Sequence, residues 1–307
     1  MVYEVPILLI VFNRPHCTEM LLNSIAILKP LNLYIAIDGP RTSNELDLIN
    51  VNKTKAVIDK LIDWECKVTY RISEENQGVK MGPFNAIKWF FSINEKGIVL
   101  EDDCIPDMSF FAFCQEMLER YSIDNRIGLI SGRNDIEVPN SIDSYFFSTS
   151  GSIWGWASWS RVINNYDVND SKYLENIERN LLSSTLDSFQ SERLAHHLKW
   201  AIFDNYIINT WDYQLHAYIK LNYQLYIIPK VNLIKNVGFG ADASHTKSVE
   251  KRTNLDSKKL LFPLIHPKWV IPNRELSKRI YRADSNSRFI WWYLVIRFRV
   301  QNFINSK

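Results

Sequence analysis

The chain has 307 residues, of which 46% are hydrophobic, 10 are glycine and 11 are proline. This composition can build a large hydrophobic core, and it excludes a disordered or collagen-like chain. The 36 Lys and Arg residues against 34 Asp and Glu leave a formal net charge of +2. That balance argues against a protein whose main partner is a nucleic-acid backbone.

The first half of the sequence alternates short apolar runs with helical patterns. Strands are expected at Ile7–Phe12, Leu31–Ile37, Cys66–Ile72, Ile98–Leu100 and Ile127–Ile130. Helices are expected at Cys17–Leu28, at Asn44–Trp64 with Leu46 and Ile49 in its apolar stripe, and at Pro83–Ile93. This alternation predicts βαβ units in a Rossmann-like, mainly parallel sheet flanked by helices. The loops after the strands then gather at one edge, where a ligand should be sought.

The pattern changes after Gly132, where Ser, Asn, Asp and Trp become frequent and the alternation fades. We therefore expect one catalytic region at 1–250, with a nucleotide half at 1–132 and an acceptor half at 133–250. A C-terminal helical tail should follow at 251–307. Its stretch Arg288–Arg299 mixes arginines with aromatic residues, which is typical of a helix that lies on a membrane or packs on a second subunit.

The cellular setting is predicted from the cysteines and the apolar runs. The four cysteines are widely spaced and form no CxxC motif, which favours a reducing, cytoplasmic environment. The first apolar run has no basic leader, and no uninterrupted run reaches the ~20 residues of a spanning helix. We expect a cytoplasmic protein, with contact to the inner face of the plasma membrane through the tail left open.

Three consecutive acids, Glu101-Asp102-Asp103, follow the predicted strand Ile98–Leu100. Like charges at the end of a buried strand repel one another, so the arrangement is costly unless a cation lies there. Carboxylate oxygens suit Mg²⁺ or Mn²⁺, which often complete their coordination with substrate phosphates. The alternative is a solvated acidic turn, or a cap for the helix that begins near Pro106.

Two further loops should face the same edge. Asn13-Arg14-Pro15 follows the first strand, and Asp38-Gly39-Pro40-Arg41 follows the second. Their guanidinium groups and carboxylate suit a nucleotide, although both segments are also ordinary turn formers. Asn76–Pro83 lacks the spacing of a Walker loop or of a dinucleotide fingerprint. Lys80 within it could pair with a phosphate or be a surface lysine.

Taken in order, these segments and the motif Trp154-Gly155-Trp156 resemble bacterial sugar-nucleotide glycosyltransferases of the GT-A type. The resemblance is close to family 2, distant to N-acetylglucosaminyltransferase I, and covers about residues 5–250. It implies that Asp103 contacts a metal bridging the donor diphosphate, with Glu101 and Asp102 beside it. It also implies that Asp38 contacts the base and that Arg14 and Arg41 lie beside the nucleotide. Asn13, Asn76 and Lys80 are the remaining candidates for donor binding.

The second half supplies candidates for the acceptor side. Trp154, Gly155 and Trp156 could form a wall for sugar rings, and the alternative is burial in the core. Asp212 lies between aromatic residues and could be the general base or a structural acid; the resemblance favours the base. His245 matches by position a further metal ligand of the family, although a lone loop histidine is often solvated.

We therefore expect a metal-dependent glycosyltransferase. It would move a sugar from a nucleoside diphosphate sugar, UDP-linked by preference, to a hydroxyl of a glycan or lipid-linked glycan in surface polysaccharide synthesis. Transfer with inversion at the anomeric carbon is preferred over retention. The alternatives are a sugar-phosphate nucleotidyltransferase and a non-catalytic carbohydrate-binding protein. The first usually has a glycine-rich loop after its first strand, and Phe12-Asn13-Arg14-Pro15 contains no glycine. The second would have no use for three consecutive acids.

Overall fold

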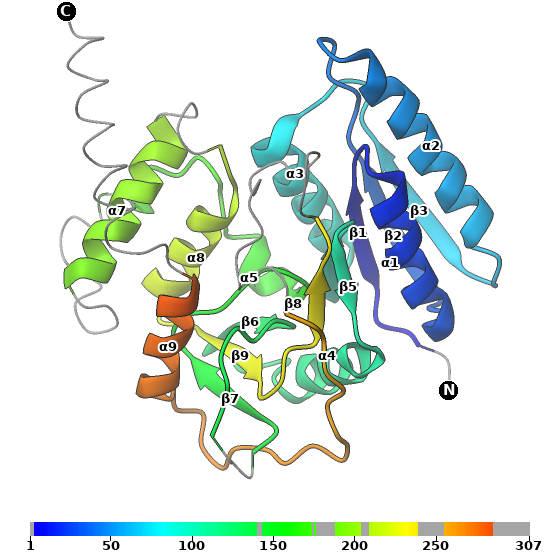
Figure 1. Cartoon of the computed structure of the whole chain (residues 1–307). Coiled ribbons are helices and arrows are strands. Elements are labelled where there is room, and N and C mark those ends of the chain that lie inside the picture. Colours follow the sequence, from blue (N-terminus) through cyan, green and yellow to red (C-terminus); the bar gives the residue numbers. More distant parts are fainter. Residues whose placement is uncertain are drawn as a thin grey trace, which may run out of the picture.

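A computed structural model describes residues 3–139, 143–173, 175, 188–203, 209–238 and 255–284 (Figure 1). The first half alternates strands and helices as expected. Its elements are β1 (Ile7–Val11), α1 (Pro15–Leu28), β2 (Asn32–Ile37), α2 (Glu45–Leu61), β3 (Lys67–Ile72), α3 (Gly78–Ile93) and β4 (Lys96–Glu101). Strands β3, β2, β1 and β4 lie side by side in that order, and all run parallel. The predicted βαβ units are confirmed.

The second half completes the same sheet. Its elements are β5 (Cys104–Pro106), α4 (Met108–Arg120), β6 (Ile127–Ser131), β7 (Tyr145–Ser148), β8 (Trp156–Trp159), α5 (Ser160–Ile163), α7 (Ser188–Phe203), α8 (Asp212–Leu221), β9 (Leu225–Pro229), β10 (Ile234–Asn236) and α9 (Arg274–Asp284). The eight-stranded order is β3-β2-β1-β4-β8-β6-β9-β7, and β7 and β8 run against the other six strands. Strands β5 and β10 form a separate antiparallel pair.

The direction of strand order reverses at β1. Strand β2 follows β1 on one side, whereas β4 lies on its other side. In open α/β sheets such a switch point leaves a crevice beyond the carboxyl ends of the two strands, where ligands bind. The loops that meet there are the turn between β1 and α1 and the residues after Glu101.

Two features of the helices differ from the sequence expectation. Helix α3 begins at Gly78 rather than Pro83, because Gly78 adopts a φ of +76° that turns the chain into the helix ahead of the proline. In α2, Leu46 and Ile49 are exposed and Asp47 is buried. The predicted apolar stripe is therefore wrong at these positions, since the first turn of α2 directs a carboxylate inward.

The core is rich in aromatic residues, several of which pack around Trp156. Trp156 of β8 is buried and stacks on Phe91 of α3, with ring centroids 6.2 Å apart. Trp211, just before α8, is also buried, and its ring centroid lies 6.2 Å from that of Trp156.

Among the described residues, no helix combines the length and apolarity needed to cross a bilayer. The predicted tail stretch Arg288–Arg299 lies outside the described residues.

Candidate functional site

The acidic residues after β4 meet Arg14 at the switch point. Asp102 is buried, and both of its oxygens accept from Arg14, through Nε at 3.3 Å and through Nη2. Nη1 of Arg14 donates to Asp103 Oδ2 at 2.9 Å. The backbone fixes this corner as well, because Asp102 N donates to the Ile10 carbonyl of β1 at 3.1 Å. Arg14 thus clamps two of the three predicted acids.

This cluster carries more negative charge than Arg14 can balance. Burial, followed by the neighbouring Asp103 carboxylate, raises the pKa of Glu101 to about 8, with smaller contributions from Asp102 and Asp212. Burial also raises the pKa of Asp102 to about 6, although Arg14 opposes this shift. A carboxyl group whose pKa rises in this way favours a proton or a cation close by. The site is therefore suited to gaining positive charge.

A glycine covers the Arg14–Asp103 pair. Val237 N donates to the Asp103 carbonyl at 2.9 Å, which brings the chain after β10 over the acids. A Cβ at Gly238 would lie 2.1 Å from Asp103 Oδ2 and 2.8 Å from Arg14 Nη1, closer than real Cβ atoms approach. Only glycine fits here without a shift. The chain then enters 239–254, so the predicted ligand His245 lies outside the described residues.

The donor chemistry fits a hard divalent cation with few protein ligands. Asp103 offers carboxylate oxygens, one paired with Arg14 and the other accepting from Cys104 Sγ at 3.5 Å. Mg²⁺ is commonly bound by one or two carboxylates together with substrate phosphates and water. Within the described ranges, no group of three or more His, Cys, Asp and Glu side chains is arranged to hold a metal ion. The metal assignment of Asp103 stays a prediction.

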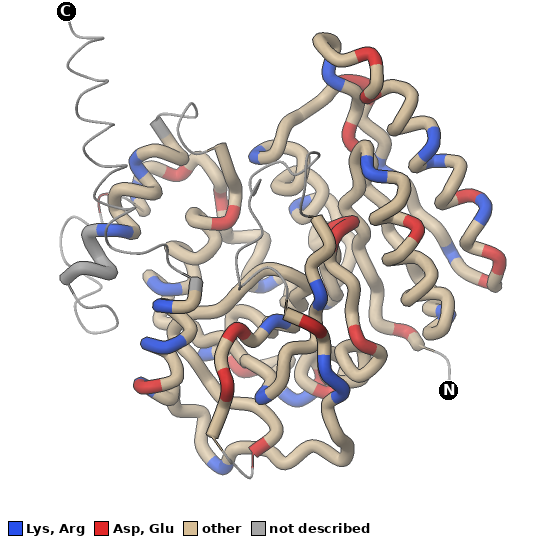
Figure 2. Tube along the Cα trace, in the orientation of Figure 1, with Lys and Arg blue, Asp and Glu red and all other residues tan. Residues whose placement is uncertain are grey.

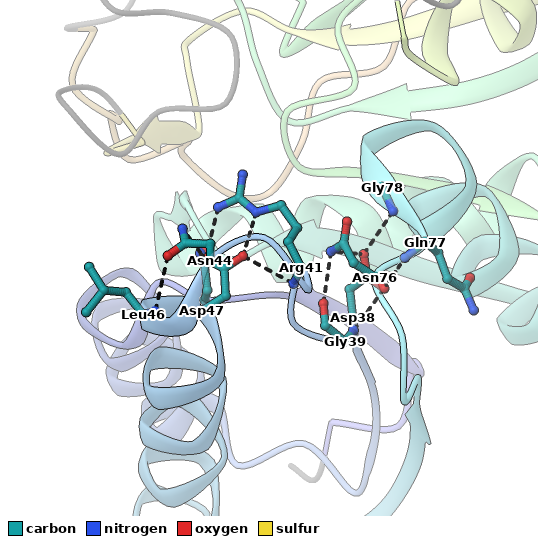
Figure 3. A network of polar contacts seen from close by, with 10 residues as sticks. Asp38, Gly39, Arg41, Asn44, Leu46, Asp47, Asn76, Gln77 and Gly78 are labelled. Carbon is teal, nitrogen blue, oxygen red and sulfur yellow. Dashed lines mark hydrogen bonds and ion pairs between the residues drawn. The ribbon is translucent and has the colours of Figure 1, made fainter.

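Asp38 is the centre of a loop network shown in Figure 3. Its Oδ1 accepts from Gly39 N at 3.0 Å and Gln77 N at 2.9 Å. Its Oδ2 accepts from Asn76 Nδ2 at 3.0 Å and Gly78 N at 3.2 Å. These four bonds match the roughly four acceptor sites of a carboxylate. Asp38 and Asn76 therefore join the loops after β2 and β3, and contact with a base would require Asp38 to give up one of these bonds.

Asp47 is a buried residue of α2 that sequence reasoning missed. Its carboxylate accepts from Arg41 through Nε at 2.5 Å and Nη2 at 2.9 Å, and from Arg41 N at 3.3 Å. It also accepts from Asn13 Nδ2 at 2.7 Å and from Asn44 Nδ2 at 3.1 Å. Hydrogen bonds from Arg41 hold the pKa of Asp47 below its usual value. Asp47 thus ties the loops after β1 and β2 together.

The Arg41 guanidinium is oriented by this contact. Its Cζ lies over the Phe12 ring, 5.6 Å from the ring centroid, and half of the side chain is exposed. In Figure 3 the remaining terminal nitrogen of Arg41 points away from Asp47. Asp47, which was not predicted, therefore brings together two predicted donor residues, Asn13 and Arg41. The sequence signal was weak, because an Asp in the first turn of a helix is common for its charge alone.

Lys80 is a predicted donor residue that is buried rather than exposed at the surface. It is buried on α3, and its Nζ donates to the Ala201 carbonyl of α7 at 2.7 Å. Burial lowers its pKa. A buried lysine that contacts a helix carbonyl joins α3 to α7, so in this structure Lys80 has a structural contact rather than a surface position.

The tryptophan motif divides between core and site edge. Trp156 is buried in β8, so it contributes to the core and presents no ring to a sugar in this structure. Gly155 has a φ of +64°, and a Cβ there would lie 2.5 Å from Ile234. Trp154 is half-buried, with the Arg133 guanidinium 4.2 Å from its ring centroid. Of the three predicted sugar-contacting residues, Trp154 alone keeps an accessible aromatic surface.

Asp212 is the first residue of α8. Its Oδ1 accepts from Thr210 Oγ1 at 2.5 Å, and it follows the buried Trp211. Its charge contributes to the raised pKa of Glu101, so the two carboxylates belong to one electrostatic neighbourhood. The fold thus brings an acid from α8 towards the acids after β4, from more than 100 residues away in sequence.

Basic and acidic residues are interspersed along the chain trace (Figure 2). Arg14 faces Asp102 and Asp103, and Arg41 faces Asp47. These two arginines of the candidate site are therefore already paired with carboxylates. This arrangement differs from a basic patch that binds a polyanion by charge alone.

No family model and no curated protein matches this sequence. Several solved structures are similar in backbone. HddC from Yersinia pseudotuberculosis in complex with GMP-PN is 12% identical, with a TM-score of 0.32 over 53% of this chain and 80% of that chain. An apo UDP-glucose pyrophosphorylase is 10% identical, with a TM-score of 0.36 over 75% and 90%.

A third similar structure is 4-diphosphocytidyl-2C-methyl-D-erythritol synthase from Anaerococcus prevotii. It is 8% identical, with a TM-score of 0.30 over 71% of this chain and 98% of that chain. None of these three structures is named as a glycosyltransferase. At these identities and TM-scores the comparisons assign no activity. The strand order itself establishes a mixed α/β, Rossmann-like fold with a mainly parallel central sheet.

Proposed function

We propose that the protein is a transferase that uses nucleoside diphosphate sugars and moves the sugar to a hydroxyl of a glycan or lipid-linked glycan. The observation that carries this proposal is the position of Arg14, Asp102 and Asp103. They lie together at the switch point of the sheet, where α/β enzymes bind their ligands. The excess negative charge there supports a role for a divalent cation, Mn²⁺ or Mg²⁺.

Each residue of the cluster has a distinct part in the proposed reaction. Asp103, with His245 as a further candidate, would hold the cation, and Arg14 would lie beside the departing diphosphate. The bound cation supplies positive charge to the leaving group. Asn13 and Arg41, fixed by Asp47, would contact the nucleotide. Trp154 would offer its accessible ring to a sugar.

Asp212 is the proposed general base. Its carboxylate would take the proton of the acceptor hydroxyl as that oxygen attacks the anomeric carbon. Attack on the face opposite the diphosphate inverts the configuration and needs one base, and Asp212 is the candidate from the acceptor half. Its electrostatic influence on Glu101 supports a place near the donor side.

Nucleotidyl transfer from a nucleoside triphosphate to a sugar phosphate is the second candidate. One of the similar structures is named as a UDP-glucose pyrophosphorylase, which is a nucleotidyltransferase. Against it stands the connection between β1 and α1, which has only three residues, Phe12, Asn13 and Arg14. Three residues without glycine give little backbone for cradling a triphosphate.

One experiment separates the candidates. The purified protein is incubated with Mn²⁺ and a panel of nucleotide sugars, or with nucleoside triphosphates and sugar 1-phosphates. Glycosyl transfer or donor hydrolysis releases a nucleoside diphosphate, whereas nucleotidyl transfer releases pyrophosphate. We expect diphosphate release from a UDP-sugar.

The variant Asp103→Ala should abolish this release while the protein stays folded. Asp63→Asn, an exposed carboxylate between α2 and β3, is the matched control and should leave the release unchanged. Pyrophosphate release would favour the second candidate. A protein that neither turns over nor is thermally stabilised by any nucleotide would contradict both candidates.

A further inference from the structure

A segment at the rim of the molecule exposes an unusual amount of apolar surface. We call residues 255–273, which precede α9, the strap; in Figure 1 it runs along the lower edge from beside α4 to α9. Leu260 and Leu264 point into the core. Five other large apolar side chains of the strap are between 42% and 75% exposed, namely Leu261, Phe262, Ile265, Trp269 and Ile271.

The strap is held to the domain along its length. Near its start, Leu260 N donates to Ser109 Oγ of α4 at 2.9 Å. In the middle, Ile265 N donates to Ser144 Oγ and Ser144 N donates to the Ile265 carbonyl, both at 2.8 Å. At its end, Asn273 N donates to the Phe147 carbonyl of β7 at 2.8 Å. The exposed side chains are therefore presented by an anchored backbone.

A histidine adds a side-chain anchor. His266 lies 3.0 Å from the Tyr145 hydroxyl through Nδ1 and 3.0 Å from Glu116 through Nε2. Backbone and side-chain contacts together fix which strap residues face the core and which face outward. Single exposed apolar residues are ordinary, but five within eleven positions form a patch of the kind that marks an interaction surface.

The charges of the strap restrict the partner. The strap contains Lys258, Lys259 and Lys268 against one acidic residue, Asp256, whose Oδ1 is paired with Lys235 Nζ at 2.7 Å. All three lysines are exposed, and Lys268 Nζ lies 5.1 Å from the Trp269 ring centroid. Apolar side chains next to a tryptophan and lysines are the combination that enters the headgroup region of anionic bilayers.

We propose that the strap binds the surface of an anionic lipid bilayer. The exposed apolar residues would enter the interface and the three lysines would lie against the headgroup charges. A second copy of this chain fits less well, because a two-fold contact through the strap would bring lysines of like charge together. The proposal is independent of the proposed function and concerns a different surface from the acidic site.

The test is co-sedimentation of the full chain with vesicles of phosphatidylglycerol and phosphatidylcholine at low salt, against vesicles of phosphatidylcholine alone. We expect binding to the anionic vesicles only, weakened by added salt. The triple variant K258Q/K259Q/K268Q should bind roughly 100-fold more weakly, because each lysine near an anionic surface contributes about fivefold. The double variant Leu261→Ser with Ile271→Ser should also lose binding.

Ile123→Ser is the matched control, because Ile123 is a highly exposed apolar residue outside the strap. Far-UV circular dichroism and the melting temperature establish that each variant is folded. The proposal is overturned if the intact protein does not bind anionic vesicles. It is also overturned if the strap variants bind like Ile123→Ser while truncation after Asp284 abolishes binding, which would assign the lipid contact to residues 285–307.

Light scattering after size-exclusion chromatography tests the alternative that a second copy of this chain binds the strap. A dimer that becomes monomeric in the Leu261→Ser, Ile271→Ser variant, without lipid binding by the intact protein, would assign the strap to a second copy. A monomer that binds anionic vesicles through the strap supports the proposal.

Discussion

Replacement of Asp47 by alanine removes the acceptor for five hydrogen bonds at once. The Asn13 and Asn44 amides lose an acceptor, which costs about 1 kcal/mol each. The Arg41 ion pair adds only about 1 kcal/mol, because half of the Arg41 side chain is exposed and can be solvated again. We therefore expect Asp47→Ala to lower the free energy of unfolding by about 2–3 kcal/mol.

The assay is urea unfolding followed by tryptophan fluorescence. Asp59→Ala is the matched control, since Asp59 lies on the same helix and is exposed. Its unfolding midpoint should stay close to that of the wild type. A midpoint for Asp47→Ala no lower than the Asp59→Ala midpoint would refute the reasoning that Asp47 holds the two loops together.

The same variant tests the role of Asp47 in ligand binding. If Asp47 positions Arg41 for the nucleotide, Asp47→Ala should weaken UDP binding by about tenfold, and so should Arg41→Gln. The double variant should then bind little worse than either single variant, because both changes remove one arrangement. If calorimetry shows that the losses of UDP affinity are fully additive, the two residues act separately. A purely structural role for Asp47 also predicts additive losses.

Three further predictions concern the acidic site. The pKa of Glu101 is raised, so between about pH 4.5 and about pH 8 the folded state holds a proton that the unfolded state releases. Without metal, the free energy of unfolding should therefore fall as pH rises through this range. Mn²⁺ should raise the melting temperature more at pH 8 than at pH 6. Glu101→Gln should flatten this pH dependence, and an unchanged profile would contradict the assignment. Asp212→Asn should lower turnover by ~10²–10⁴ with UDP affinity little changed, and collapsed affinity with intact turnover would instead place Asp212 at the donor. Gly238→Ala should weaken Mn²⁺ and UDP binding, because its Cβ would displace Asp103 and Arg14; calorimetry that matches the wild type would show that the loop adapts.

The parallel half of the fold could be predicted because its signals are local. The apolar runs of β1, β2 and β4 are continuous, as expected for strands covered on both faces, and the helices between them follow helical spacing. The edge shared by Arg14, Asp102 and Asp103 followed from strand direction alone. Their ion pairs did not, because which nitrogen meets which oxygen depends on side-chain packing.

The rest depended on contacts between distant segments. Strand β8 has four residues and pairs with β4 and β6 on either side, and its sequence alone resembles a tryptophan-rich loop. For the same reason the sequence left open whether Trp156 contacts a sugar or lies in the core, and the structure buries it. Asp47 was overlooked because its partners Asn13 and Arg41 come from two other loops. Such pairings carry no periodic signal in the sequence.

The antiparallel placement of β8 has a consequence for how the chain is made. During synthesis β4 is complete at Glu101, but the strand that covers its outer edge begins only at Trp156. Until then the parallel half presents an open, apolar edge strand, which is a template for pairing with another chain. Fragments that end before residue 156 should therefore aggregate, and those that include β8 should be better protected. In the cell, the nascent chain would need shielding over this interval of synthesis.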